Sequence, residues 1–301
     1  MAAPKPTPLI AYLGVQQQID REMAQILLTA AKEAEKIVGG IQGAKGASAA
    51  MTSAKMKQAS AALRKASGEM YGEVTRTMRT GMKTAAAAAV SSETFVNDAL
   101  YNAFGARLPA LEQAFAYDAS NAIEAAYAKA QNGIPLASQV YRTNALTDGS
   151  VDRVLNNGIL LQQSAAQIAS TVAALINPFT PGGTSYAANR LARTELNNAF
   201  HTAQINRRAD EPWTQGMKWH LSGSHPRPDA CNEYATGVNF KGGDPGVFKA
   251  DAVPGKPHPN CLCYLTTVTD TEEQFIEDFL AGKHDAYMDQ QIYKSGLGTV
   301  C

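Results

Sequence analysis

Alanine is concentrated in one part of this 301-residue chain, and its distribution limits the folds that the chain can adopt. The first 210 residues contain 46 of the 52 alanines, whereas the last 91 contain all four cysteines and both tryptophans. Alanine favours helix more than any other residue, but it buries little apolar surface. We therefore predict a long, mainly helical arm or bundle over residues 1–177, followed by a smaller part of different character.

The spacing of apolar residues predicts where the helices lie. Apolar residues three and four apart form one stripe between Ile19 and Ile37, and Gly39-Gly40 should end this helix. We expect a joint near residues 39–49 and further helices at about 91–105, 108–131, 151–176 and 185–208. The helix at 151–176 has a heptad pattern, which fits either an ordinary core helix or an oligomer formed through helices.

Beyond Pro212 the pattern changes to short β-like runs. Strands are predicted at Met217–Leu221 and Leu262–Val268, separated by sequence rich in turn residues. We expect Trp219 to lie in the core, and Trp213, next to Pro212, to be partly exposed. The last 32 residues (270–301) carry seven acidic and two basic side chains, and a helix near 271–281 should be capped by Thr269 or Asp270. The fold class is α+β, with a module at 184–269 and an acidic helical tail at 270–301.

The charges cancel over the whole chain but not within its parts. With 27 basic and 27 acidic residues, the chain is not built as a uniformly basic nucleic-acid-binding protein. No run of 18 apolar residues occurs, so we expect no membrane span. The first ten residues contain three prolines and do not resemble a secretory signal, so we do not expect a secreted disulfide scaffold. One segment does have eight basic and only two acidic residues, and it could contact DNA phosphates or form a solvated helix face. Its basic residues are Lys45, Lys55, Lys57, Arg64, Lys65, Arg76, Arg79 and Lys83.

Metal-binding residue types gather within 39 residues of the second part. Zinc prefers thiolate and imidazole ligands in tetrahedral sites, and a structural zinc would close a loop-rich module with few large apolar residues. Our preferred ligands are Cys231, His258, Cys261 and Cys263, with Asp229 and His225 as alternatives for the fourth position. Two other interpretations stay open: a disulfide from Cys231 to one of the later cysteines, or simply buried thiols. Cys301, the last residue, is given no role.

Four short motifs resemble one family when they are taken in order. They are Ala192-Arg193-Thr194-Glu195-Leu196, Trp219-His220, Asp229-Ala230-Cys231 and Pro257-His258-Pro259-Asn260-Cys261-Leu262-Cys263. This succession, over about residues 184–269, resembles the phage Mu F-like family of minor head, or head-morphogenesis, proteins of tailed phages. Tyr234 and Leu262 stand where many members have cysteine and arginine, a difference that affects the metal site more than the resemblance.

The resemblance implies a virion protein, assembled in the host cytoplasm and present in few copies inside the head at the portal vertex. It would bind the portal protein and act in head assembly or in DNA packaging and ejection. The packaged DNA and the major capsid or scaffold protein are further expected partners. By the same resemblance, Arg193 and Glu195 would brace the turns of the C-terminal module; a solvated helix surface is the alternative for both.

Sequence motifs give little support to catalysis. HExxH, Walker, GxSxG and glycine-rich dinucleotide-binding motifs are all missing from the sequence. We therefore predict a protein that is not an enzyme. The alternative is a metal-dependent nuclease or hydrolase that uses the same His/Cys cluster, with His225, Asp229 or Glu233 as a general base.

Overall fold

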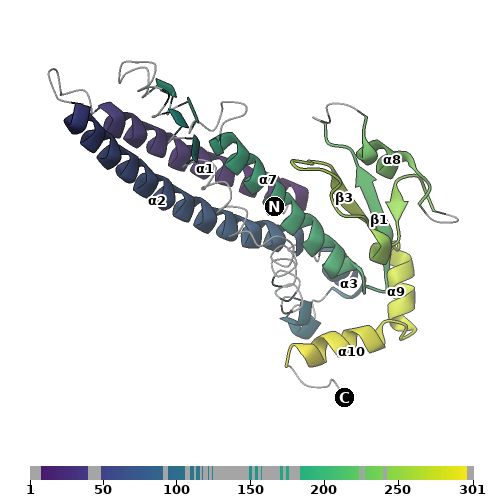
Figure 1. Cartoon of the computed structure of the whole chain (residues 1–301). Helices are drawn as coiled ribbons and strands as arrows, with labels where there is room; N and C mark the ends of the chain where they lie inside the picture. The colour runs from purple at the N-terminus through teal and green to yellow at the C-terminus, as the bar shows by residue number, and fades with distance from the viewer. Residues whose placement is uncertain are drawn as a thin grey trace. The chain divides into compact units, whose positions relative to one another are not determined.

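The computed structural model describes residues 8–39, 49–90, 94–105, 184–223, 228–239 and 243–296, together with residue 225 and isolated positions between 109 and 175 (Figure 1). Seven helices have bounds in this part of the chain: α1 (Pro8–Gly39), α2 (Ala49–Val90), α3 (Thr94–Phe104), α7 (Thr184–Arg208), α8 (Ala230–Thr236), α9 (Glu272–Leu280) and α10 (Asp285–Lys294). The strands are β1 (Thr214–His220), β2 (Val247–Phe248) and β3 (Tyr264–Thr269), and a short 3-10 helix, η2, covers Ala250–Ala252. The fold is therefore α+β, as predicted.

The chain divides into two compact units, which are described separately. One contains residues 1–16, 82–130 and 194–301, and the other contains residues 17–81 and 131–193. This grouping differs from the boundaries expected at residues 177, 184 and 269. None of the helices in the described part is both long enough and apolar enough to cross a membrane.

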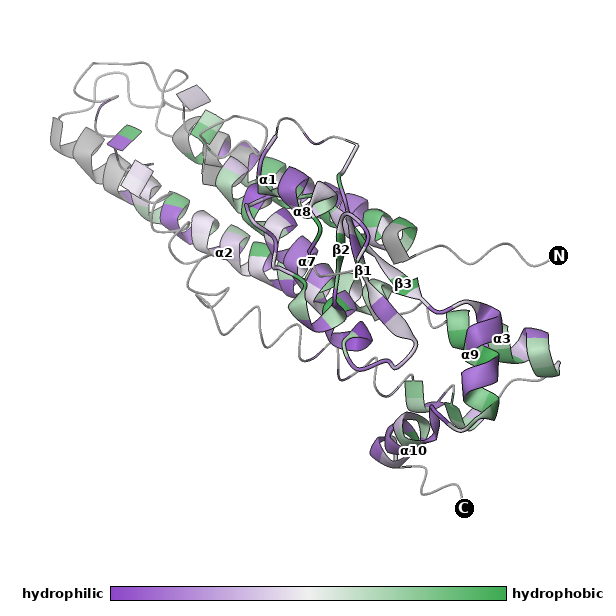
Figure 2. Cartoon of the chain, turned by 90° about the vertical axis from the view of Figure 1, so that its right-hand side faces the viewer, coloured by the Kyte–Doolittle hydropathy of each residue, from purple (hydrophilic) through white to green (hydrophobic). Residues whose placement is uncertain are grey.

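In the second unit, α1 and α2 run side by side in opposite directions (Figure 1). The apolar stripe predicted on α1 is buried, with Met23 and Leu27 fully inaccessible, and α2 contributes Val74 and Met78 to the interior. Hydrophobic and hydrophilic residues accordingly alternate around both helices (Figure 2). Helix α1 ends at Gly39, as predicted. The joint near 39–49 and the heptad pattern of 151–176 fall almost entirely outside the described residues.

In the first unit, a small antiparallel sheet has the strand order β2-β1-β3. The register pairs Met217 with Phe248 on one side, and Trp219 with Leu265 on the other. Met217 and Trp219 point inward from β1 because alternate residues of a strand face the same side. Together with side chains of α8, η2 and the loop before β3, they form a core against which Ile205 of α7 packs. The predicted strands and the helix at 185–208 are confirmed, with small shifts in their bounds.

The acidic C-terminal segment is folded into a second core. Phe275 of α9 and Met288 and Ile292 of α10 are buried together with α3 residues and Trp213. The expectation that Trp213 is partly exposed was wrong: it is completely buried because the aromatic rings of both C-terminal helices pack around it.

The predicted cap of α9 was also wrong by one or two residues. β3 continues through Thr269, the backbone N–H of Asp270 donates to the carbonyl of Trp213, and α9 begins only at Glu272. Thr271 is the N-cap instead, and its hydroxyl accepts a hydrogen bond from the N–H of Gln274 at 3.2 Å.

Candidate metal centre

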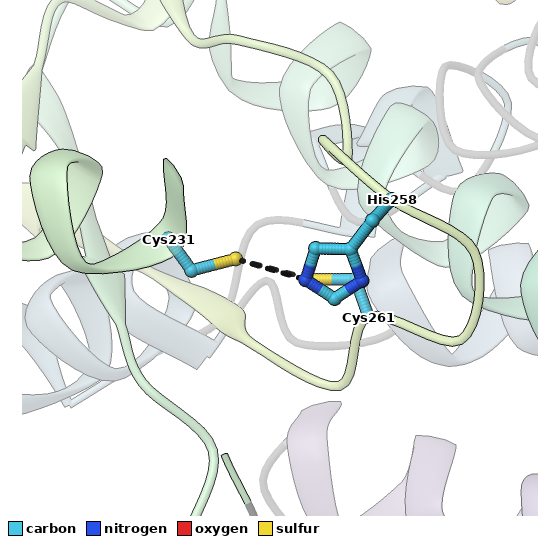
Figure 3. A group of neighbouring side chains, drawn as sticks. All are labelled: Cys231, His258 and Cys261. Carbon is cyan, nitrogen blue, oxygen red and sulfur yellow. Dashed lines mark hydrogen bonds between the residues drawn. The ribbon is translucent and has the colours of Figure 1, made fainter. Parts of the chain in front are cut away.

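Three of the four preferred ligands meet at one point in the first unit (Figure 3). The sulfur of Cys231 lies 3.4 Å from the sulfur of Cys261 and 3.6 Å from Nε2 of His258. In a tetrahedral zinc site, bonds of about 2.3 Å to sulfur and about 2.05 Å to nitrogen place two sulfurs about 3.8 Å apart and a sulfur and a nitrogen about 3.5 Å apart. The donor types and their separations therefore fit zinc, and this group could hold a metal ion.

The N-terminus of α8 positions Cys231. Asp229 is the N-cap residue, and its Oδ1 accepts a hydrogen bond from the N–H of Cys231 at 2.7 Å. The side chain of Asn232 completes a reciprocal cap by accepting from the N–H of Asp229 at 3.0 Å. Cys231 is thus held in the first turn of a short helix, where its side chain is fully buried in the core of the module.

The loop before β3 supplies the other two donors, and α7 supports it. Asn260 adopts a left-handed backbone conformation with φ of 59°, which turns the chain between His258 and Cys261. Its backbone N–H donates to the hydroxyl of Thr194 on α7 at 2.9 Å. A second bond joins Nε2 of His201 to the carbonyl of Pro254 at 2.8 Å. The helix and the loop that carry the family-like motifs are therefore in direct contact.

His258 is oriented for metal binding through Nε2. Its Nδ1 lies 3.1 Å from the carbonyl of Pro259, which can only accept, so Nδ1 carries a proton when this bond forms. Nε2 points toward the sulfur of Cys231 and lies 3.0 Å from Oδ2 of Asp229, which can only accept, so a metal ion on Nε2 would replace the hydrogen bond to Asp229. Metal-bound histidines commonly have such a second hydrogen bond, because it fixes both the tautomer and the ring orientation.

Cys263, His225 and Asp229 surround these three donors. Cys263 is 1% exposed, and its sulfur lies 3.8 Å from Nδ1 of His225. Nε2 of His225 contacts Oδ1 of Asn232 at 2.8 Å, and Oδ2 of Asp229 lies 3.0 Å from Nε2 of His258. A cysteine, a histidine and an amide in a row resemble the arrangement of a cysteine nucleophile. The burial of Cys263, however, keeps substrates away from its sulfur.

Burial determines the protonation of the thiols. It is the main cause that raises the pKa of Cys231 and of Cys261 above the usual value, so both thiols are neutral in the metal-free protein at pH 7. Metal binding therefore displaces protons from them. For Asp229, desolvation opposes ionisation, but the hydrogen bond from Cys231 and the two nearby histidines together lower its pKa.

Lys256 brings a positive charge to the same loop. Its Nζ donates to the carbonyl of Cys263 and lies 5.2 Å from the centre of the Trp219 ring. Burial lowers the pKa of Lys256, a shift that the three cysteines would oppose only when ionised. Neither Lys256 nor Thr194 was singled out from the sequence. Thr194 lies inside the ARTEL motif, but no spacing rule connects it with a loop 66 residues later.

None of the other motif residues chosen from the sequence is a donor of this centre. Arg193 pairs with Asp20 of α1 at 2.8 Å. Glu195 is buried, and desolvation raises its pKa. Trp219 is in the core, as predicted.

The basic segment lies on α2. Arg64, Lys65, Arg76, Arg79 and Lys83 are all exposed there, and Lys83 pairs with Glu124 at 2.9 Å. Lys45 and the side chains of Lys55 and Lys57 are outside the described part of the chain. The exposed members fit either a phosphate-binding surface or a solvated helix face, so both interpretations stay open.

Comparisons with protein-family models, with curated proteins and with solved structures give no match. The centre is therefore interpreted from its own geometry and from the motif resemblance.

The backbone at Asn260 gives a first test of the loop geometry. Asn260→Gly should leave the stability nearly unchanged, whereas Asn260→Val should lower it by about 1–2 kcal/mol, because a β-branched residue adopts positive φ only with strain. Urea unfolding of the two variants measures the difference. Equal stability of the two would show that this left-handed turn is not maintained in solution.

Proposed function

We propose that this chain is a minor head protein of a tailed phage, which binds the portal protein inside the head and acts in head assembly or in DNA packaging and ejection. The proposal rests on the family-like motifs. It is supported by one observation above all: the ARTEL helix and the HPNCLC loop, far apart in the sequence, are joined by the hydrogen bond from Asn260 to Thr194. The motifs thus belong to one folded module, as their shared order in a family would require.

Within this module, a structural zinc ion would be held by Cys231, His258, Cys261 and Cys263. Cys263 is favoured over Asp229 as the fourth ligand, because it is buried in the same core as Cys231 and Cys261, whereas Asp229 caps α8 through Oδ1 and contacts His258 through Oδ2. Bound zinc would supply a cross-link between α8 and the loop before β3. The three sulfurs are at most 2% exposed, which favours a structural role over catalysis at an open coordination position.

The protein would act by binding rather than by turnover. Helical surfaces would contact the portal and the major capsid or scaffold protein, and they would also join copies of this chain. The exposed basic residues of α2 would contact packaged DNA through phosphates, without reading its sequence. A metal-dependent nuclease or hydrolase is the competing function, but no observation at the site favours it.

The decisive experiment is quantitative mass spectrometry of purified phage particles, with this chain counted against the portal and major capsid proteins. About a dozen copies per particle or fewer are expected, because the resemblance implies a protein present in few copies at the portal vertex. Absence from the particle would overturn the proposal, and a nuclease assay with added divalent metal would then test the competing function.

A further inference from the structure

His284 connects α9 to α10 in the first unit and is 3% exposed. Its ring stacks on Phe275, with centroids 5.3 Å apart and planes inclined by 17°. The edge of Trp213 meets it at 5.6 Å. An ionisable ring is therefore enclosed by aromatic side chains in the core that holds the C-terminal helices.

Neither ring nitrogen of His284 has a hydrogen-bond partner in the described part of the chain. The same holds for Nε1 of Trp213 and Oε1 of Gln291, which belong to the same region. A neutral imidazole loses water at one donor and one acceptor when it is buried in this way. A protonated ring would bury a full charge and two donors without an acceptor, which is far less favourable.

Some charged groups around His284 raise its pKa and others lower it. Asp278 of α9, Asp270 before α9 and Asp285 of α10 favour the protonated ring, whereas Lys283 disfavours it. Burial outweighs these carboxylates and lowers the pKa of His284. From α7, the guanidinium of Arg207 donates to the hydroxyl of Tyr287, whose ring packs on Trp213. The charge of Arg207 is paired with that of Glu211, whose carboxylate lies 3.2 Å from Nη1.

We propose that His284 is a pH-sensitive latch, whose protonation in mild acid releases α10 from Trp213 and Phe275. The connection to α10 is direct. The carbonyl of His284 accepts the N–H of Met288 at 2.9 Å, and Met288 and Ile292 are the side chains that anchor α10 in the core. When the ring moves toward water, the first turn of α10 and both anchors move with it.

The sign of the effect follows from the burial of the neutral ring. Above the pKa of about 6.5 of an exposed histidine, both the docked and the released states are neutral, and pH has no effect. Below that value, only the released state binds the proton. Its population then rises by up to about tenfold for each pH unit, until the lower pKa of the docked state is reached.

Hydrogen exchange of the full chain, read out on peptides from α10, tests the latch between pH 7.5 and 5.5. After correction for the intrinsic exchange rate, we expect protection of residues 285–294 to fall by up to about tenfold at pH 5.5. His284→Phe keeps the aromatic stack and removes the titration, and His284→Gln removes the titration with a neutral polar side chain. Both should abolish the acid response.

His220→Gln is the matched control, because His220 lies on β1 and stacks on Tyr264 of β3, and neither residue belongs to the core around Trp213; this variant should keep the response. Peptides from residues 257–263 report separately on any acid-induced opening of the loop before β3, so the response of this loop is distinguished from that of α10. Protection of α10 that does not change with pH in the wild type would overturn the proposal. So would an unchanged acid response in either His284 variant.

Discussion

Replacing Cys261 with serine is expected to abolish zinc binding and to unfold the module around β1. The sulfur of Cys261 lies next to Cys231, and both are enclosed in the core that also contains Trp219. Structural zinc sites contribute apparent binding energies of about 10–16 kcal/mol, which count as folding energy when the ligands are dispersed in the unfolded chain. The free energy of unfolding of a domain is only about 5–15 kcal/mol, so losing the binding energy of the ion is enough to unfold the module.

Metal analysis and thermal unfolding monitored by tryptophan fluorescence measure this effect. The purified wild type should contain one zinc ion per chain, and Cys261→Ser should contain none. Cys301→Ser is the matched control, because it makes the same chemical change at a cysteine outside the proposed site. A wild type that holds no zinc after expression in zinc-supplemented medium would contradict the proposed centre.

Replacing Glu211 with glutamine should destabilise the first unit by about 3–5 kcal/mol. The Glu211 carboxylate is completely buried and lies 3.2 Å from Nη1 of Arg207 and 2.8 Å from Nη1 of Arg208. Arg207 is also fully buried and stands over the ring of Phe115. Glutamine keeps the shape of the side chain but removes its charge, which leaves the Arg207 guanidinium buried without its counter-ion.

Urea unfolding followed by the fluorescence of Trp213, which lies beside this network, provides the measurement. Glu273→Gln makes the same change on the exposed face of α9 and should shift the stability by no more than about 0.5 kcal/mol. If the two variants lost equal stability, the buried ion pairs would not be important for the fold.

Local patterns predicted the elements near the candidate site. The alternation of Met217 and Trp219 indicated a strand with one buried face, and the spacing of Ala192, Leu196 and Ala203 indicated the buried face of α7. Both signals arise from the geometry of a single element, and that geometry is nearly independent of the rest of the chain.

Long-range packing could not be predicted in the same way. Trp213 follows a proline in a polar stretch, and its burial depends on α9 and α10, some 60 or more residues later. The acidic composition of residues 270–301 suggested a helical tail but gave no sign of its packing against Trp213. The negative charges, however, lie mainly on the outer faces of these helices, while Phe275, Met288 and Ile292 face inward.

Only part of the candidate site could be predicted, because some of its contacts also depend on long-range packing. Residue type identified Cys231, His258 and Cys261, which the structure brings together. The contribution of Thr194 was missed, because a hydroxyl that receives one backbone N–H leaves no trace in composition or spacing. Asp229 was predicted as an alternative ligand. Its role as the N-cap of α8 was not predicted, because that role depends on the backbone conformation at Asp229.

The connections between α7 and the loop before β3 also bear on the order of folding. The bonds from His201 to Pro254 and from Asn260 to Thr194 span 53 and 66 residues, and the neighbouring sulfurs of Cys231 and Cys261 are 30 residues apart in the chain. Contacts this distant require the closure of large loops, which slows folding relative to the formation of α7 itself. During synthesis, α7 would therefore form before the loop is in place. The cysteine and histidine donors would come together only after most of the module had left the ribosome.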